Sequence, residues 1–108
     1  MFAVYILASK PNGTLYTGVT SDLLTRVRQH KAGTFDGFTK TYGVTRSVYR
    51  EFHDYWESAF MREKRIKRWL RNWKIALIEA DNPHWEDLAA SWDHPEFRPD
   101  WGGITPPR

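Results

Sequence analysis

The feature that most constrains the fold is a pair of β-forming segments separated by a short turn. Residues 2–8 read FAVYILA, which is rich in residues that favour strands, and residues 10–13 supply the turn sequence KPNG. The segment TLYTGV follows directly and predicts the returning strand of a β-hairpin. A hairpin at the start favours an α+β fold over a doubly wound parallel sheet, in which helices join successive strands.

A helix is expected immediately after the hairpin. Ser21 is the candidate N-cap, Asp22 beside it suits the positive end of a helix, and Gly33 ends a helix that reaches about Ala32. Apolar residues recur on one side of this helix and are expected to face inward: Leu23, Leu24 and Val27.

The next segments predict a third strand and two helical stretches. Residues 33–45 contain three glycines and several threonines and are expected to form a loop, whereas RSVYREF at 46–52 predicts a strand. A long helix should run from about residue 55 to 71, and a second stretch at 73–80 continues it or follows a bend near Asn72. The expected architecture is α+β, a small three-stranded antiparallel sheet flanked by helices in the order β-β-α-β-α-α.

Charge divides the chain into a basic body and an acidic end. Residues 1–80 carry 14 Lys and Arg against 7 Asp and Glu, whereas residues 81–108 carry 2 against 6. We expect one domain over 1–80 and an acidic, Trp- and Pro-rich extension over 81–108, in which a short helix begins near Asn82. The basic body suits a polyanionic partner such as nucleic acid, and a solvated cationic surface explains it equally well.

Two absences in the composition narrow the function further. The chain has no cysteine, so disulfides and thiolate metal sites are excluded. It has no apolar run near the roughly 20 residues that cross a bilayer, and its first ten residues lack the basic start of a signal peptide. We therefore expect a cytoplasmic protein that does not bind membranes.

Four polar residues of the first half are candidates for phosphate chemistry. Arg26 and His30 are four residues apart and share one face of the expected helix. An arginine offers a planar set of donors to phosphate oxygens, and a neutral histidine accepts or relays a proton near pH 7. Tyr5 and Tyr16 sit on the two strands of the hairpin. Taken singly, these residues also suit a solvated basic helix and half-buried strand tyrosines.

One carboxylate of the long helix stands out. Glu63 lies on or beside the apolar stripe formed by Ala59, Ile66 and Leu70, where a charge needs a partner. An ion pair within the helix is the commoner arrangement, and a divalent cation held in a cleft is the alternative. The neighbouring residues are strongly cationic: Arg62, Lys64, Arg65, Lys67, Arg68, Arg71 and Lys74.

Taken together, the segments VYIL, LYTGVT, LLTRVRQH and AFMREKRIKRW resemble the GIY-YIG nuclease superfamily, and more narrowly its small stand-alone bacterial members. The resemblance covers residues 2 to about 80. Tyr16 follows Tyr5 by eleven positions, and Arg26 follows Tyr16 by ten. His30 comes four positions after Arg26, and the glutamate lies on a later helix. WKIALIEADNPHWEDL resembles the end of the small subfamily. The tripeptides read Ala-Val-Tyr and Tyr-Thr-Gly, so both tyrosines and Gly18 are kept.

The resemblance implies a metal-dependent endonuclease that hydrolyses phosphodiester bonds of nucleic acid, DNA rather than RNA, with structure-selective cleavage or DNA repair left open. Glu63 would bind one Mg²⁺ or Mn²⁺ ion, and Arg26 would bind the scissile phosphate. Tyr5 is the first choice of general base, with Tyr16 and His30 orienting or relaying protons, although which tyrosine is the base stays open. The residues expected to bind the nucleic-acid backbone are Lys40, Arg62, Lys64, Arg65, Lys67, Arg68 and Arg71.

Two other functions remain open. The first is a catalytically weak or inactive nucleic-acid-binding module of the same fold, because residues 81–108 are too few for a second DNA-binding domain and a protein partner would have to supply specificity. The second is a basic protein-interaction domain, supported only by three tryptophans: Trp85, Trp92 and Trp101.

Some aromatic and amide residues have no settled role. Three helix tryptophans could stack on bases, but we expect at least two of them to be packing residues: Trp56, Trp69 and Trp73. Asn72 and Asn82 are candidates for the asparagine that some nucleases of this superfamily use after the glutamate.

Overall fold

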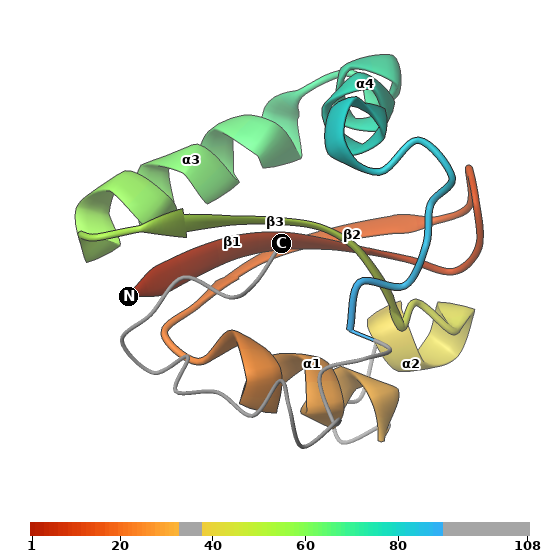
Figure 1. The fold of residues 1–108 in the computed structure, drawn as a ribbon, viewed down its shortest axis with the longest axis horizontal. Helices are drawn as coiled ribbons and strands as arrows, with labels where there is room; N and C mark the ends of the chain where they lie inside the picture. Colours follow the sequence, from red (N-terminus) through yellow and green to blue (C-terminus); the bar gives the residue numbers. More distant parts are fainter. Residues whose placement is uncertain (33–37, 90–108) are drawn as a thin grey trace.

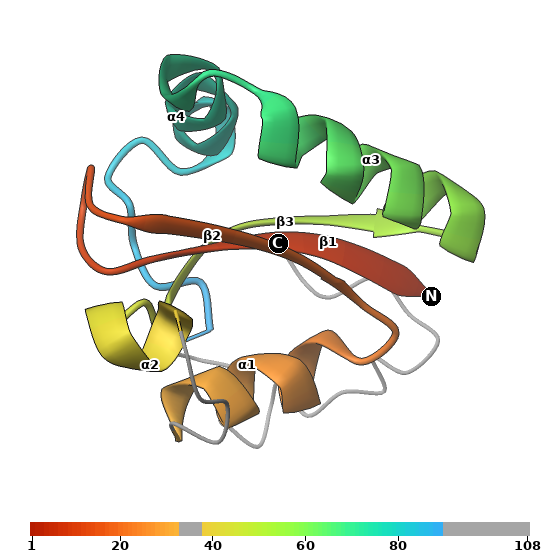
Figure 2. The ribbon, with the colours of Figure 1, turned by 180° about the vertical axis from the view of Figure 1, so that it is seen from behind.

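A three-stranded antiparallel sheet forms the middle layer of the protein. This computed structural model describes residues 1–32 and 38–89. The strands are β1 (Phe2–Ala8), β2 (Leu15–Thr20) and β3 (Arg46–His53), in the order β2-β1-β3. Helices α3 (Trp56–Arg68) and α4 (Arg71–Asp81) cover one face, and α1 (Leu23–Lys31) and α2 (Phe38–Tyr42) cover the other (Figures 1 and 2). The predicted α+β fold with a three-stranded antiparallel sheet is confirmed.

The central strand β1 is buried on both faces. Val4 and Ile6 face α3 and α4, where they pack in one core cluster with Ile66 and Ile78. The alternating residues point the other way, and Ala3, Tyr5 and Leu7 pack with Leu23 and Val27 of α1. Because side chains alternate along a strand, the FAVYILA segment supplies both cores at once and delivers Tyr5 to the α1 side.

The hairpin turn is held from both sides. The backbone N–H of Gly13 donates to the Lys10 carbonyl at 2.9 Å, and Asn12 takes a left-handed conformation with φ 57°. Nη2 of Arg71, at the start of α4, donates to the carbonyls of Asn12 and Gly13 at 2.7 and 2.6 Å. The first residue of α4 thus fixes the tip of the hairpin that carries both tyrosines.

Helix α1 begins one residue later than expected. Asp22, not Ser21, is the N-cap: its Oδ1 accepts from the Thr25 N–H at 3.2 Å, and its Oδ2 accepts from the Thr25 hydroxyl at 2.8 Å. A carboxylate at this position both satisfies a free N–H and interacts favourably with the helix dipole. The predicted inward residues are confirmed, with Leu23 and Val27 buried and Leu24 packed against them. Gly33 lies outside the described residues.

Two expectations about the middle of the chain are wrong. Part of the segment expected to be a loop forms the short helix α2. The break between the last two helices falls at Trp69 and Leu70, whose backbones are extended with ψ 151° and 150°, and not at Asn72. The Leu70 carbonyl accepts from the N–H groups of Trp73 and Lys74, so a new helix starts where the old one stops.

The short helix expected from Asn82 is absent from the described residues, where 82–89 form turns. The buried Asn82 side chain donates to the carbonyls of Val48 and Glu86 at 3.1 and 2.9 Å, and accepts from the Glu86 N–H. These bonds to the neighbouring backbone replace helical ones. Asp87 accepts from the Ser47 N–H and pairs with Lys31 at 2.5 Å. We therefore propose to count residues 82–89 with the domain over 1–80. Among the described helices, none has the length and hydropathy needed to span a membrane.

Candidate active site

Three aromatic side chains from three elements meet on the α1 side of the sheet. The Tyr5 hydroxyl of β1 lies 3.2 Å from Nε2 of His30, a buried residue in the last turn of α1. The Tyr16 ring of β2 lies 5.3 Å from the imidazole and 6.3 Å from the Tyr5 ring, centroid to centroid. The predicted grouping of both tyrosines with this histidine is therefore present in the fold.

Gly18 makes room for Tyr5. The two residues are paired in the register of β1 and β2, and a Cβ at position 18 would overlap the hydroxyl and the ring of Tyr5. Only a glycine lets the phenol cross the edge strand at this point. The glycine that the sequence keeps in its Tyr-Thr-Gly tripeptide thus has a packing reason.

The surroundings keep both Tyr5 and His30 neutral at pH 7. Burial raises the pKa of the Tyr5 phenol, and the nearby Tyr16 adds to this rise. Burial also lowers the pKa of His30, and the positive charge of Arg26 lowers it further. A protonated phenol beside a neutral imidazole is a pair across which one proton can move.

Arg26 and Glu63 approach this pair from opposite faces of the sheet. Arg26 is half-buried on α1, and its charge opposes the rise in the pKa of Tyr5. Glu63 belongs to α3 on the other face, and its charge contributes to that rise. Both charges therefore lie within electrostatic range of the phenol. The other four residues that the sequence singled out therefore all act on Tyr5.

Glu63 already has a partner in this structure. The residue is 8% exposed, and Nζ of Lys67, one turn further along α3, lies 2.7 Å from its Oε2. Within the described residues, no group of three or more His, Asp or Glu side chains is placed to hold a metal. One carboxylate still fits Mg²⁺, which keeps several waters and often takes its other ligands from substrate phosphates. A metal ion at Glu63 would replace the Lys67 ammonium.

The cations predicted to bind nucleic acid divide into two groups. Arg62 pairs with Glu51 and lies 5.0 Å over the Trp69 ring, Arg71 holds the hairpin tip, and Lys67 pairs with Glu63. Lys67 and Arg71 are exposed despite these contacts, and so are the remaining four: Lys40, Lys64, Arg65 and Arg68. Of the two candidate asparagines, Asn72 is exposed on α4, whereas Asn82 is buried in the structural bonds described above.

The helix tryptophans are more exposed than expected. Trp56 and Trp73 are 42% and 55% exposed, and only Trp69 is half-buried. The expectation that at least two of the three pack inside is therefore wrong. Trp56 is the first residue of α3, Trp69 follows its last residue, and Trp73 lies in the first turn of α4.

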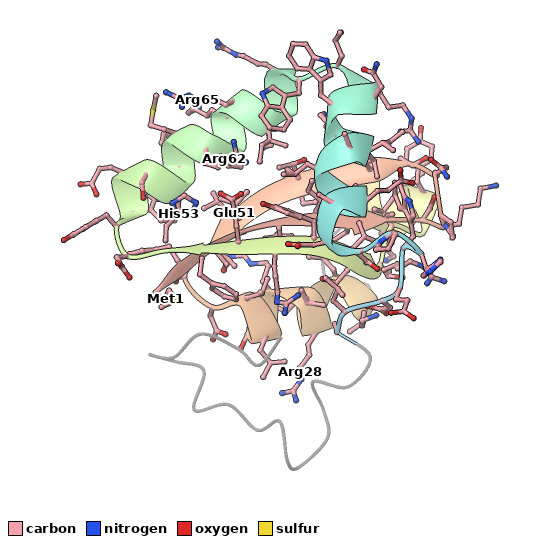
Figure 3. All side chains as sticks on the ribbon, turned by 45° about the horizontal axis from the view of Figure 1, so that its top comes forward. Met1, Arg28, Glu51, His53, Arg62 and Arg65 are labelled. Carbon is pink, nitrogen blue, oxygen red and sulfur yellow. The ribbon has the colours of Figure 1, made fainter. Side chains whose placement is uncertain are left out.

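A hydrogen-bonded cluster on β3 was not predicted from the sequence. Glu51 accepts from the Tyr49 hydroxyl at 2.5 Å and from Nε of Arg62 at 3.1 Å, and lies 2.5 Å from Nε2 of His53. Figure 3 shows the side chains of Glu51, His53 and Arg62 close together between β3 and α3. Burial works against ionisation here, but the hydrogen bonds from its neighbours keep the pKa of Glu51 below its ordinary value. The alternation of Tyr49, Glu51 and His53 along one strand is the signal that could have found it.

These features define a protein of the GIY-YIG family. The model of the GIY-YIG catalytic domain matches residues 1–76, so the chain belongs to this family of nucleases. More narrowly, it is similar to UPF0213 proteins, small GIY-YIG proteins of bacteria. A UPF0213 protein of Clostridium perfringens is 39% identical over 77 residues, which cover 71% of this chain and 82% of the relative. One from Staphylococcus haemolyticus is 38% identical over 76 residues, 70% of this chain and 92% of the relative.

A solved structure supports the same assignment. The solution NMR structure of a UPF0213 protein from Bacillus halodurans superposes with a TM-score of 0.51 at 29% sequence identity. The match covers 84% of this chain and 98% of the other. The predicted resemblance to the small stand-alone GIY-YIG proteins is confirmed.

Proposed function

We propose that this protein is a metal-dependent endonuclease that hydrolyses phosphodiester bonds, in DNA rather than RNA. The observation that carries the proposal is the arrangement around Tyr5, with the His30 imidazole at 3.2 Å and the charges of Arg26 and Glu63 acting on the phenol. A buried acid–base pair between a cation and a carboxylate has no need to exist in a passive binding surface. A cytoplasmic location, a role in DNA repair and a protein partner that supplies specificity belong to the same proposal.

The residues take the following roles. Arg26 binds the scissile phosphate and stabilises its extra negative charge in the transition state. Tyr5 accepts a proton from the attacking water while its own proton passes to Nε2 of the neutral His30. Tyr16 orients the water or the phenol. Glu63 would hold one Mg²⁺ or Mn²⁺ ion, which would supply further stabilisation of negative charge in the transition state.

The proposal is tested by cleavage of labelled single-stranded, duplex, flapped and branched DNA and of RNA, with Mg²⁺ or Mn²⁺. Glu63→Gln and Arg26→Ala are run beside the wild type, each checked for folding by circular dichroism. The matched control is Arg28→Ala, which removes the same charge from the exposed side of α1. Metal-dependent cutting that is lost in the two site variants and kept in the control supports the nuclease.

A nucleic-acid-binding module is the second candidate. The observation in its favour is the Lys67–Glu63 pair, which neutralises the carboxylate that a metal requires. In that case the wild type cuts none of the substrates, binds DNA in a salt-sensitive way, and Glu63→Gln binds as tightly as the wild type. A basic protein-interaction domain would neither cut nor bind.

A further inference from the structure

Two aromatic rings of α3 form an exposed stack. Trp56 and Phe60 lie with ring centroids 5.8 Å apart and an interplanar angle of 27°. They are 42% and 38% exposed, although large aromatic side chains usually bury most of their surface. Phe2 packs edge-on against Trp56 at 5.5 Å, so the stack is supported from the sheet and open to solvent on its other side. We call Trp56 and Phe60 the aromatic platform.

The platform carries a positive charge at one end. Nζ of Lys64 lies 4.6 Å from the centroid of the Phe60 ring. Lys67, seven residues after Phe60 and four after Glu63 on the same flank of the helix, is a second exposed cation near the platform. An aromatic face bordered by cations is suited to a ligand that has both flat rings and negative charges, and nucleic acid has both.

The platform is aligned with the proposed active site. Phe60 precedes Glu63 by three residues and Trp56 precedes it by seven, so all three lie on one side of α3. Arg62 leans from α3 towards β3, where it pairs with Glu51. Because the sheet order is β2-β1-β3, the opposite flank of the helix, with Phe60 and Lys64, leans towards β2 and the Tyr16 side of the site.

We propose that the aromatic platform binds an unpaired nucleobase next to the phosphate that reaches Glu63. This inference rests on the proposed function, because it places the substrate at that site. A base inside a duplex has both faces covered by its neighbours, whereas an unpaired base can stack on Phe60 or Trp56. The substrate class is therefore a single-stranded segment, including the unpaired arm of a flap.

The test measures binding without cleavage, with the full chain in the presence of a chelator. The probes are a labelled twelve-nucleotide thymidine strand, an abasic strand of the same length, and a matched duplex. The variants are Trp56→Ala and Phe60→Leu, and Trp73→Ala is the matched control because it removes an exposed tryptophan from α4. Phe60→Leu keeps an apolar side chain on the helix, so it remains informative if Trp56→Ala folds poorly.

We expect the intact strand to bind about tenfold more tightly than the strand without bases, because stacking of even one base on an aromatic ring strengthens binding by about this factor. Phe60→Leu and Trp56→Ala should reduce this ratio severalfold, whereas Trp73→Ala should leave it near the wild-type value. In the NMR spectrum, the Trp56 indole N–H, assigned by its loss in the variant, should shift with the intact strand only.

Equal binding of the two strands, or equal losses of both in the platform variants, would overturn the inference. So would an effect confined to Trp73→Ala, which would place the contact on α4. Its failure is distinct from failure of the proposed function. Cleavage that depends on Glu63 together with no base-dependent binding leaves the nuclease standing and removes the platform. Base-dependent binding without cleavage leaves the platform standing and removes the nuclease.

Discussion

Gly18 and Tyr5 lie opposite each other on neighbouring strands, and the Tyr5 phenol fills the space that a side chain at position 18 would need. The phenol is 1% exposed and held in the core beneath α1, so it cannot simply rotate away. The position of the proposed general base thus depends on the absence of a side chain on the edge strand.

Replacing Gly18 with alanine should destabilise the protein and displace the phenol. Forcing one extra methyl group into a packed site costs about 1–3 kcal/mol, and we expect this range for the free energy of unfolding in urea. The double variant Gly18→Ala/Tyr5→Phe should recover part of the loss, because the hydroxyl is one of the overlapping atoms. A change below about 0.5 kcal/mol in Gly18→Ala, the usual effect of a surface substitution, would contradict the packing argument.

The stability of the protein should fall as the pH drops below about 6.5 because of His30. Burial and the charge of Arg26 lower the pKa of this imidazole in the folded state below the value of about 6.5 of an unfolded chain. The unfolded state therefore binds the proton more tightly. The stability due to neutral His30 is complete above the pKa of the unfolded state and is lost as the pH falls from there through the pKa of the folded state. Urea unfolding at several pH values should show a shallower decline in His30→Gln. A folded-state pKa above 6.5 in an NMR titration of His30 would reverse the prediction.

Replacing Glu51 should loosen α3. The carboxylate accepts from groups on both β3 and α3, and its side chain is 19% exposed. Glu51→Gln leaves polar groups around it poorly paired and should cost about 1–3 kcal/mol. Glu86→Gln, at an exposed side chain, is the control and should change stability by less than about 0.5 kcal/mol. If the two variants unfold alike, the cluster does not stabilise the fold.

The lowered pKa of Glu51 predicts a second pH-dependent loss of stability, at acidic pH. Its lowered pKa means that the folded state holds the carboxylate ionised more readily than the unfolded state does. The corresponding stability is present above the ordinary value of about 4.3 and is lost as the pH falls below it through the folded value. Glu51→Gln should remove this acid step and leave the His30 step in place. Persistence of the whole acid step in the variant would assign it to other carboxylates.

Removing Lys67 should strengthen metal binding to the free protein. The Lys67 ammonium lies 2.7 Å from Glu63, so a divalent cation must displace it. The i,i+4 pair is weak and Lys67 is half-exposed, so we expect Lys67→Met to raise the affinity for Mn²⁺ only about two- to fivefold.

Paramagnetic broadening of amide signals near Glu63, followed by NMR during a Mn²⁺ titration, measures this affinity even when it is weak. Lys64→Met is the matched control, because it removes the same charge from the residue that directly follows Glu63 and leaves the Lys67–Glu63 pair intact. Broadening that persists in Glu63→Gln would place the metal elsewhere.

Local patterns predicted the strands and the shared helix face of Arg26 and His30, whereas the grouping of these residues with the tyrosines and Glu63 followed from the resemblance to the GIY-YIG superfamily. FAVYILA alternates towards two cores, and the spacing of Arg26 and His30 is one helical turn, so these residues had few other places to go. A bend near Asn72 was one of the two expected alternatives, but its position at Trp69 and Leu70 was not predictable, since both residues are apolar and continue the helical pattern. The role of Asn82 depends on the carbonyl of Val48, a contact across 34 positions that no local pattern encodes.

The Glu51–Arg62 contact joins residues only 11 positions apart and spans the tight connection from β3 to α3. The hairpin of the two tyrosine strands is equally local, since Ala8 pairs with Leu15, whereas β3 joins β1 through long-range pairs such as Phe2 with His53. Short-range contacts form at a lower cost in chain entropy than long-range ones. We therefore expect two local units to form separately, the β1–β2 hairpin with both tyrosines and the β3–α3 unit with Glu63, and to meet only when β3 joins β1. Assembly of the site would then report the last step of folding.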